Sequence, residues 1–450
     1  MPVNEERKAP ARADAEGDGP DRVIRVGVLG CGNVGGALVD LVDSDADGIA
    51  RRAGVRLEIA RVAVRNLAKP RTVSLGLDRL THDAHALATD PSIDIVVELI
   101  GGIEPARTLI LDALKSGKPV VTANKELLAN VGAELHAAAE AAGRELLFEA
   151  AVAGAIPLVR ALQVSLAGER VRRVMGIVNG TTNYILSRMA EERIGYAEAL
   201  SEAQSLGYAE RDPAADVEGY DASAKAAILA GIAFNAEVVA GDVYREGIES
   251  IEVADIDFAR RLGYEVKLLA VAELDESDGR RVGVRVHPAM VPAEHPLAGV
   301  RGPFNAVFIE GEASGELMLY GRGAGGRPTA SAVLGDILDA ARSLEARCAP
   351  RPVHREHVEL RPIDELHTQY YVTIDVLDRP GVLAGVAAVF GEHHVSIRSM
   401  EQVDLGEEAR LVFITHVARE ADVQATLAGL QRVAAVERIG GLLRVIGPER

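Results

Sequence analysis

The amino-acid sequence predicts three domains: an α/β nucleotide-binding domain, an α+β domain built on a mixed sheet, and a small C-terminal domain of ferredoxin-like βαββαβ order. Three observations support this prediction. Residues 25–148 alternate apolar strands with helices, which is typical of a parallel sheet with crossover helices. After Glu149 longer strands dominate, and from Gln369 on six short elements follow one another in the order βαββαβ.

The bulk composition is that of a globular protein. The chain has 450 residues, of which 48% are hydrophobic and 26% are charged. Its net charge of −18 argues against nonspecific binding to nucleic acid or to anionic membranes. It has two cysteines, Cys31 and Cys348, and no apolar run of membrane-spanning length, so we expect a reducing, cytoplasmic setting. Residues 1–20 are polar and lack the apolar core of a signal peptide, and we expect a disordered tail.

The first domain is predicted over residues 21–148 as a Rossmann-like fold. Its expected strands are RVGVLG, LEIARVAV, DIVVELIG, PVVTA and ELLFEA, and its helices include ALVDLVD, RTLILDALKSG and ELHAAAEAAG. A glycine turn follows the first strand: Gly30, Gly32 and Gly35 form G-x-G-x-x-G around Asn33 and Val34. In this setting the turn lets the backbone and the helix N-terminus approach a pyrophosphate, so these five residues are predicted to bind a dinucleotide.

The second strand suggests which dinucleotide binds. An acidic residue near its tip would bind the ribose hydroxyl of NAD, but Arg65, Lys69 and Arg71 stand there instead. Arg65 is placed to meet a 2′-phosphate, which favours NADP and leaves NAD possible. The alternative is that these cations are ordinary solvated surface residues.

The second domain is predicted over residues 149–321. Its strands are expected at RRVMGIVNG, VKLLAVAEL, RVGVRVHPAMV, AVFIEG and GELMLYG, and its helices at YILSRMAEE, YAEALSEAQSLG and DASAKAAILAGIAFN. A Gly-rich turn that contains Gly325 and a long amphipathic helix follow over residues 322–346 and are expected to return to the first domain. Residues 347–368 lack periodicity and are interpreted as a linker, and residues 369–450 form the C-terminal domain.

Charged residues that could contact a substrate occur in two places. Lys125 follows the strand PVVTA, at the edge of a parallel sheet where α/β proteins bind ligands. Asp221 and Lys225 share one face of a helix that is otherwise almost all small and apolar, just after the carboxylates of Glu210 and Asp216. A solvent-exposed ion pair is the usual outcome of this spacing. The apolar helix and the crowded carboxylates favour instead a site for a substrate that carries an ammonium group.

The chain resembles the homoserine dehydrogenase family with a C-terminal ACT domain. The segments that carry the resemblance are GCGNVGG, TANKELLA, GIVNGTTNYIL, GYAERDPAADVEGYDASAK, HPLAGVRGPFNAV and YGRGAGGRPTA, and DRPGVLAGVAAVF resembles the start of an ACT domain. The resemblance implies NAD(P)-dependent interconversion of L-homoserine and L-aspartate 4-semialdehyde in the biosynthesis of threonine, methionine and isoleucine. It also implies that the second domain is the catalytic and dimerisation domain.

The resemblance also implies roles for single residues. Lys225 matches the proton-transfer lysine of the family, and Lys125 matches the lysine between cofactor and substrate. Glu210 matches the carboxylate that holds the amino group of homoserine, and Asp216 and Asp221 match acidic residues that shape the pocket and support Lys225. A free lysine titrates near 10.4, so Lys225 would need a lower pKa. Our hypothesis is that burial and Lys125 lower it by more than Asp221 raises it.

Four further expectations come with the resemblance. The segment EAAVAGAIP matches a loop that binds a monovalent cation, expected to be Na+, whose ligands would be Glu149, Val152, Gly154 and Ile156, mostly through backbone carbonyls. Gly325, in the later Gly-rich turn, is expected to contact the cofactor. The ACT domain implies L-threonine as an effector, with Gly381 in the turn that would receive its carboxylate. The assembly is expected to be a homodimer or homotetramer.

Other functions remain open at this point. One alternative is a catalytically silent protein that senses NADP and amino acids, which the presence of Lys125, Lys225 and Glu210 together argues against. Another is an amino-acid dehydrogenase of different specificity on the same scaffold, which GTTNYIL and AERDPAADVEGYDASAK argue against.

Overall fold

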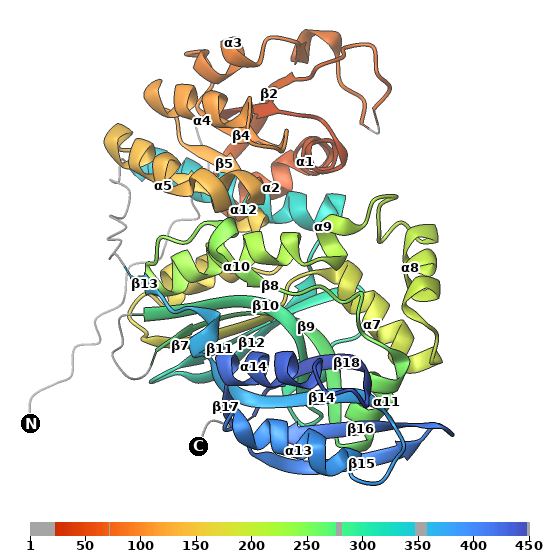
Figure 1. Ribbon diagram of the computed structural model, residues 1–450. Coiled ribbons are helices and arrows are strands. Elements are labelled where there is room, and N and C mark those ends of the chain that lie inside the picture. The colour runs from red at the N-terminus through yellow and green to blue at the C-terminus, as the bar shows by residue number, and fades with distance from the viewer. Residues whose placement is uncertain (1–22, 72, 276–280, 347–357, 448–450) are drawn as a thin grey trace, which may run out of the picture.

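The computed structural model describes residues 23–71, 73–275, 281–346 and 358–447. The tail expected over residues 1–20 and residues 347–357 of the expected linker lie outside these ranges. Figure 1 shows the nucleotide-binding domain at one end of the molecule, the catalytic domain in the middle and the C-terminal domain at the other end. Within the described residues, no helix combines the length and the apolarity that crossing a membrane requires.

The nucleotide-binding domain is a six-stranded parallel sheet in the order β3-β2-β1-β4-β5-β6. β1 alternates between the two faces of the sheet. Ile24 and Val28 join the core beneath α1, α2 and α12, whereas Gly27 lies on the other face against α3. The strands are β1 (Val23–Leu29), β2 (Arg56–Ala63), β3 (Leu80–Thr81), β4 (Ile95–Glu98), β5 (Val120–Thr122) and β6 (Leu146–Leu147). The helices are α1 (Asn33–Ser44), α2 (Ala46–Ala53), α3 (Ala84–Thr89), α4 (Ala106–Lys115), α5 (Lys125–Ala142) and, from much later in the chain, α12 (Gly326–Ala346).

The catalytic domain is built on a mixed sheet, in which β10 runs antiparallel to β9 and parallel to β8. Its strands are β7 (Val171–Ile177), β8 (Tyr244–Arg245), β9 (Tyr264–Leu274), β10 (Arg281–Pro292), β11 (Phe304–Gly311) and β12 (Gly315–Arg322). Its helices are α6 (Leu158–Arg160), α7 (Gly180–Glu192), α8 (Tyr196–Ser205), α9 (Ala214–Val217), α10 (Tyr220–Phe234) and α11 (Val253–Arg261). α10 packs on β9 and β10, and residues 221–230 of this helix are all buried because small side chains let it approach the sheet closely.

The C-terminal domain has the ferredoxin-like order that the sequence predicts. Its elements are β14 (His367–Leu377), α13 (Val382–Glu392), β15 (Ile397–Asp404), β16 (Glu408–Thr415), the short β17 (Ala418–Arg419), α14 (Glu420–Leu430) and β18 (Val436–Val445). The strands lie in the order β18-β14-β16-β15. The apolar sides of α13 and α14 cover one face of this sheet, around Phe390 and Phe413.

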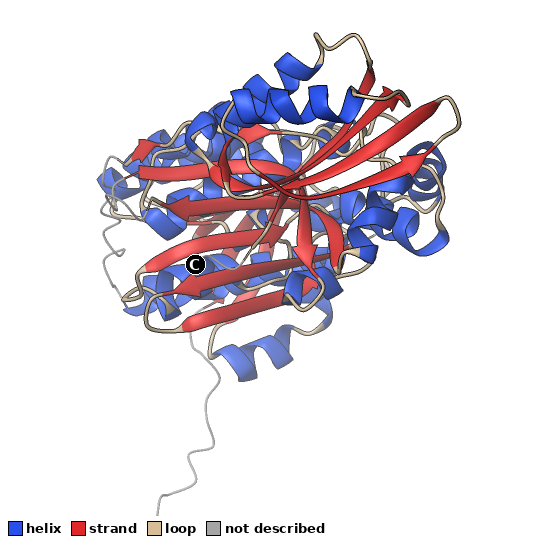
Figure 2. Cartoon of the chain, turned by 60° about the horizontal axis from the view of Figure 1, so that its bottom comes forward, coloured by secondary structure: helices blue, strands red, loops and turns tan. Residues whose placement is uncertain are grey.

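The sheets of the catalytic and C-terminal domains are continuous, which the sequence does not predict. β10 pairs with β18 through Ala289 with Arg444 and Met290 with Val445, so that one 12-stranded sheet runs through both domains. Figure 2, which draws the strands as red arrows, shows a broad layer of strands across the middle of the molecule with helices on both sides. The expected linker also differs, because its end holds β13 (Glu359–Leu360), which pairs with β10. The aperiodic sequence conceals this pairing because two residues are too few to show an alternating pattern.

Candidate active site

The glycine turn after β1 has the geometry that a dinucleotide needs. Gly30 has a φ of +104°, and a Cβ on it would stand 2.7 Å from the carbonyl oxygen of Leu99. A Cβ on Gly35 would stand 2.3 Å from the carbonyl oxygen of Gly30. Gly32, in contrast, has open space in front of it, and α1 begins there without a capping side chain from the described residues. The N-terminus of α1 therefore has no capping side chain within the described part of the chain and has open space at Gly32, as the approach of a pyrophosphate requires.

One of the cations after β2 reaches this turn. Arg65 is exposed two residues beyond the end of β2. Arg71 folds back over the same loop and donates hydrogen bonds to the carbonyl oxygens of Asn66 and Lys69, at 2.5 and 2.9 Å. Burial raises the pKa of the Cys31 thiol in the glycine turn, and the nearby Arg71 opposes this rise. Arg71 thus reaches the turn itself.

The edge of the sheet positions Lys125 through three side chains that the sequence reading does not single out. Glu98 is fully buried at the end of β4 and accepts hydrogen bonds from the backbone N–H of Ile100, at 2.7 Å, and from the hydroxyl of Thr122, at 2.5 Å. Asn124 caps α5, because its side-chain oxygen accepts from the backbone N–H of Leu127 at 3.1 Å. Lys125 is therefore the first residue of α5, at the carboxyl edge of the parallel sheet.

Lys125, Asp221 and Lys225 meet across the boundary between the first two domains. Lys225 is only 8% exposed, and its Nζ donates to Asp221 Oδ2 at 2.7 Å and to the carbonyl oxygen of Val178 at 2.6 Å. The other oxygen of Asp221 pairs with Lys125 Nζ. One buried carboxylate thus holds two lysines, one from each domain.

The two lysines have opposite pKa shifts. Burial lowers the pKa of Lys225, and the positive charge of Lys125 adds to this effect, so that together they outweigh the attraction of Asp221. Burial also acts against the charged form of Lys125, but Asp221, Asp216 and Glu126 outweigh it, and its pKa is raised. Burial raises the pKa of Asp221, yet the two lysines lower it by more, and the net shift is downward. The net direction for Lys225 is the one that our hypothesis requires.

Asn179 ties the carboxylates together and was not selected from the sequence. Its side-chain amide donates to Asp216 Oδ1 at 2.7 Å and to Asp221 Oδ2 at 2.8 Å. Its side-chain oxygen accepts from the backbone N–H of Thr182 at 2.9 Å and so caps α7. The segment NGTTNYIL held the only available signal, since an Asn before a helix is a typical N-cap.

Asn305 of β11 is a second neighbour that was missed. Its amide donates to the carbonyl oxygen of Val178 at 2.9 Å, the same oxygen that accepts from Lys225. The side-chain oxygen of Asn305 is buried without a hydrogen-bond partner among the described residues.

The remaining predicted substrate residues, Asp216 and Glu210, lie in different surroundings. Asp216 is half-buried in α9 and joins the cluster through Asn179. Glu210 lies on the loop between α8 and α9 with its side chain exposed. The structure therefore brings Asp216, Asp221, Lys125 and Lys225 together, and leaves Glu210 on a loop that precedes them.

The candidate cation loop has a backbone suited to carbonyl ligands. Ala153 and Gly154 both have positive φ, and a Cβ on Gly154 would stand 2.4 Å from the carbonyl oxygen of Gly323. The carboxylate of Glu149 accepts from the backbone N–H groups of Val159 and Arg160, both at 2.8 Å. Both oxygens of the Glu149 side chain therefore already accept a hydrogen bond from the backbone.

The backbone oxygens decide whether a cation fits this loop. The carbonyl oxygen of Ile156 accepts from the backbone N–H of Leu158 at 2.8 Å. No hydrogen bond to the carbonyl oxygens of Val152 or Gly154 occurs within the described part of the chain. Both oxygens are therefore available as carbonyl ligands.

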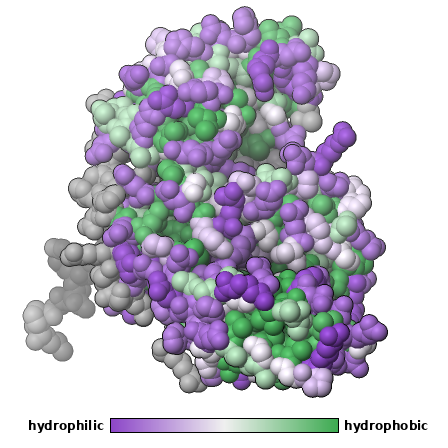
Figure 3. All heavy atoms as spheres, viewed as in Figure 1, coloured by the Kyte–Doolittle hydropathy of each residue, from purple (hydrophilic) through white to green (hydrophobic). Residues whose placement is uncertain are grey.

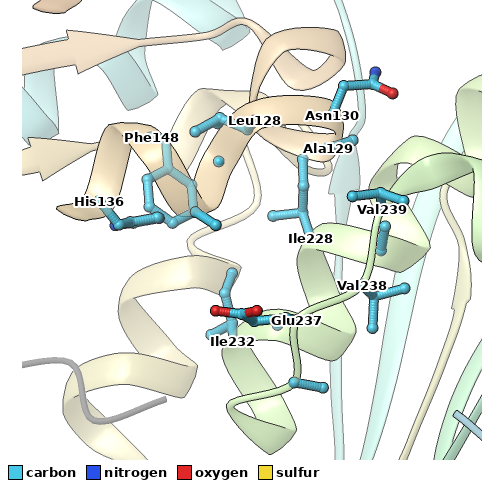
Figure 4. A pocket seen from close by; sticks show the side chains of 15 residues that line it. Leu128, Ala129, Asn130, His136, Phe148, Ile228, Ile232, Glu237, Val238 and Val239 are labelled. Atoms are coloured by element: carbon cyan, nitrogen blue, oxygen red, sulfur yellow. The ribbon is translucent and has the colours of Figure 1, made fainter. Parts of the chain in front are cut away.

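A separate cavity lies between α5 and α10, beyond the two lysines. It has a volume of about 230 Å³ and is lined mainly by apolar side chains, with Leu128 and Phe148 on one side and Ile228 and Ile232 on the other (Figure 4). None of the residues predicted to bind cofactor, substrate or cation lines it. The cavity is therefore distinct from the lysine–aspartate cluster.

Comparison with known proteins identifies the family. The family model described as "Homoserine dehydrogenase" matches residues 157–338, and the model "Homoserine dehydrogenase, NAD binding domain" matches residues 30–149. Homoserine dehydrogenase of Corynebacterium glutamicum is 48% identical over 432 residues, which cover 95% of this chain and 97% of that protein. The chain belongs to the homoserine dehydrogenase family. It is accordingly an NAD(P)-dependent oxidoreductase.

The other comparisons agree with this membership. Homoserine dehydrogenase of Mycobacterium leprae is 50% identical over 437 residues, covering 95% of this chain and 98% of that protein. A crystal structure of a homoserine dehydrogenase from Thiobacillus denitrificans superposes with a TM-score of 0.89 at 41% identity, covering 94% of this chain and 98% of that one. An ACT domain model matches residues 370–435. The predicted fold class and family are thus confirmed.

Proposed function

We propose that the chain interconverts L-homoserine and L-aspartate 4-semialdehyde with Lys225 as the residue that accepts and returns the hydroxyl proton. The observation that carries this proposal is the buried position of Lys225, which Asp221 holds in place at 2.7 Å and where burial lowers the pKa of Lys225. A lysine with a lowered pKa is neutral in a larger share of molecules near neutral pH, and only the neutral amine can accept a proton.

The neighbouring residues have distinct tasks in this proposal. Asp221 holds Lys225 and Lys125 at fixed positions, and Asn179 holds Asp221 and Asp216. Lys125 remains protonated, because its pKa is raised, and its charge favours the alkoxide that forms as the substrate loses its proton. A nicotinamide bound at the glycine turn would supply the hydride acceptor. Glu210 and Asp216 would hold the substrate ammonium group.

Replacement of Lys225 tests the assignment. Lys225→Arg keeps the positive charge but removes a group that deprotonates easily, whereas Lys225→Met removes both. We expect kcat to fall by about 10² to 10⁴ in both variants, which is the usual contribution of a positioned base, with cofactor binding retained. Turnover is measured as reduced-nicotinamide absorbance with L-homoserine.

Two outcomes of this experiment would contradict the proposal, and a third would show that the variant does not isolate proton transfer. Near-normal turnover by either variant would show that Lys225 is not the proton acceptor. Loss of NADP binding in the Lys225→Arg variant would show that the change had disturbed more than proton transfer. Wild-type protein that binds NADP without turnover would favour the silent sensor.

The cofactor we propose is NADP. Arg65 is exposed beyond β2, and Arg71 reaches the glycine turn, so cations stand where a carboxylate would favour NAD. A hyperthermophilic archaeal homoserine dehydrogenase, 27% identical to this chain, has been solved in complex with NADPH. We expect kcat/KM to be higher with NADP than with NAD, and we expect Arg65→Ala to lower the ratio of the two kcat/KM values. If this ratio were unchanged in Arg65→Ala, Arg65 would not be the source of the preference for NADP.

We further propose that L-threonine inhibits the enzyme by binding the ACT domain, which would place the chain in threonine, methionine and isoleucine biosynthesis. Gly381 has a φ of +89° and precedes α13, whose N-terminus is not capped by a described side chain, so the turn offers donors to a carboxylate. Added L-threonine should lower the rate and give a heat of binding. Neither effect would be seen if the domain only pairs subunits.

The same domain supports a homodimer or homotetramer. Figure 3 shows apolar side chains gathered over the C-terminal domain at the bottom of the view. Leu383 of α13 and Met400 of the edge strand β15 are 38% and 39% exposed. Pairing of two copies would cover these side chains and the free edge of β15.

The Na+ proposed for the loop with Val152 and Gly154 is tested separately, by replacing NaCl with a large organic cation salt at constant ionic strength.

A further inference from the structure

A buried arginine of the C-terminal domain is bonded to the catalytic domain. Arg444 of β18 is 1% exposed. Its guanidinium donates to both carboxylate oxygens of Glu420 in its own domain, at 2.7 and 2.8 Å. It also donates to both oxygens of Glu246 in the catalytic domain, each at 2.9 Å. Two-point contacts of this kind fix orientation as well as distance.

Glu246 belongs to segment 244–248, which lies directly against the turn between α9 and α10. The backbone N–H of Ile248 donates to the carbonyl oxygen of Val217 at 2.9 Å. A Cβ on Gly247 would stand 2.4 Å from the same oxygen, so the two backbones touch. On its other side the segment is held to the sheet, because the N–H of Glu246 donates to the carbonyl oxygen of Val286 at 2.8 Å.

The same segment also contacts the first residue of α10. The guanidinium carbon of Arg245 lies 3.7 Å from the ring centroid of Tyr220, a cation–π contact. Tyr220 directly precedes Asp221, and Val217 directly follows Asp216. Both carboxylates of the lysine–aspartate cluster are therefore one residue away from a contact with segment 244–248.

We propose that Arg444 is a positioning residue for the active site. Through Glu246 it holds segment 244–248 against the α9–α10 turn, and this turn sets the places of Asp216 and Asp221. The inference rests on the proposed function, because it uses the roles of these two carboxylates. It gives the C-terminal domain a direct mechanical link to substrate binding, whether or not an effector is bound.

The most informative variant changes Glu246 rather than Arg444. Loss of Arg444 would leave the buried carboxylate of Glu420 without its cation and endanger folding. Glu246→Gln keeps the shape and removes the charge, and its side chain is already 28% exposed. The matched control is Glu252→Gln, which weakens another contact between the same two domains. Glu252 accepts from Arg438 of β18 at 2.6 Å, but at the start of α11.

Both variants are made in the full-length chain, and their Tm, kcat and KM values for L-homoserine and NADP are compared with the wild type. For Glu246→Gln we expect kcat/KM for homoserine to fall on the order of tenfold, because small displacements of positioned groups cost up to about a hundredfold. Most of this fall should lie in the KM for homoserine, with the KM for NADP unchanged. Glu252→Gln should lower Tm comparably and leave homoserine kinetics unchanged.

The possible outcomes separate this inference from the proposed function. If the wild-type protein turns over L-homoserine and Glu246→Gln has the same homoserine kinetics as the wild type, the inference is overturned and the proposed function stands. An equal kinetic loss in Glu252→Gln would overturn it too, because general destabilisation would then explain both. A wild-type chain without homoserine turnover would overturn the proposed function, and the inference with it.

Discussion

Asn179 offers a direct test of how the site is held together. Its amide donates to Asp216 and Asp221, and its oxygen caps α7. Asn179→Ala removes these three contacts and also the hydrogen bond that the Asn179 oxygen accepts from the Thr182 hydroxyl at 3.0 Å. Asn179→Ser keeps a good N-cap residue, but its hydroxyl sits one bond nearer the backbone than the amide nitrogen and does not replace the amide as donor to either carboxylate. The pair of variants therefore separates capping from the support of the carboxylates.

The contacts set the expected magnitude. A hydrogen bond to a charged group contributes about 1.5–3 kcal/mol, and the lower end applies here because Asp221 also has two lysine partners. Loss of both bonds should thus destabilise either variant by about 3 kcal/mol, and loss of the cap should cost Asn179→Ala about 1 kcal/mol more. The loss of kcat/KM should be equal in the two variants, since the carboxylates lose the same donor in each.

Urea unfolding and steady-state kinetics with L-homoserine measure these effects. Asn130→Ala is the control, since Asn130 is an exposed asparagine whose amide donates to the carbonyl oxygen of Glu126 in its own helix. It should change stability by less than about 0.5 kcal/mol. If Asn179→Ser were as stable and as active as the wild type, the reasoning would be refuted, because the two carboxylates would not depend on the amide.

Two further predictions concern the glycine turn and a buried lysine. Gly32→Ala should leave Tm nearly unchanged and raise the KM for NADP, because a Cβ there meets open space that the pyrophosphate needs, whereas Gly35→Ala should lower Tm because its Cβ would stand 2.3 Å from a backbone oxygen. Equal Tm values for both variants would contradict this. Burial lowers the pKa of Lys267 from 10.5 to about 8, so stability should rise as pH climbs through this window, where the unfolded chain binds the extra proton. In Lys267→Met this rise in the free energy of unfolding, which is about 3 kcal/mol at about 1.4 kcal/mol per pKa unit, should be absent. If the free energy of unfolding had the same pH dependence in Lys267→Met and in the wild type, Lys267 would not be the group responsible.

Much of the architecture could be predicted because its signals are local. The glycine turn, the strand before Lys125 and the apolar helix around Lys225 each lie within a few residues of sequence. Hydrophobic periodicity in such windows shows which face of an element is buried. The elements that escaped prediction, such as α11 and β13, are short or carry charged residues on most of their surface. Their periodicity is correspondingly weak.

The sequence by itself determined the family and the fold class, and it selected Lys125, Asp221 and Lys225 as candidates for the site. Only the tertiary structure decided that Asn179, 42 residues before Asp221, bonds to it. It likewise decided that Arg444 meets Glu246 across 198 residues and that β18 extends the catalytic sheet. The physical reason is that hydrophobic burial is non-directional. A sequence pattern shows that a side chain is buried, but the packing of distant segments selects the polar group that it meets.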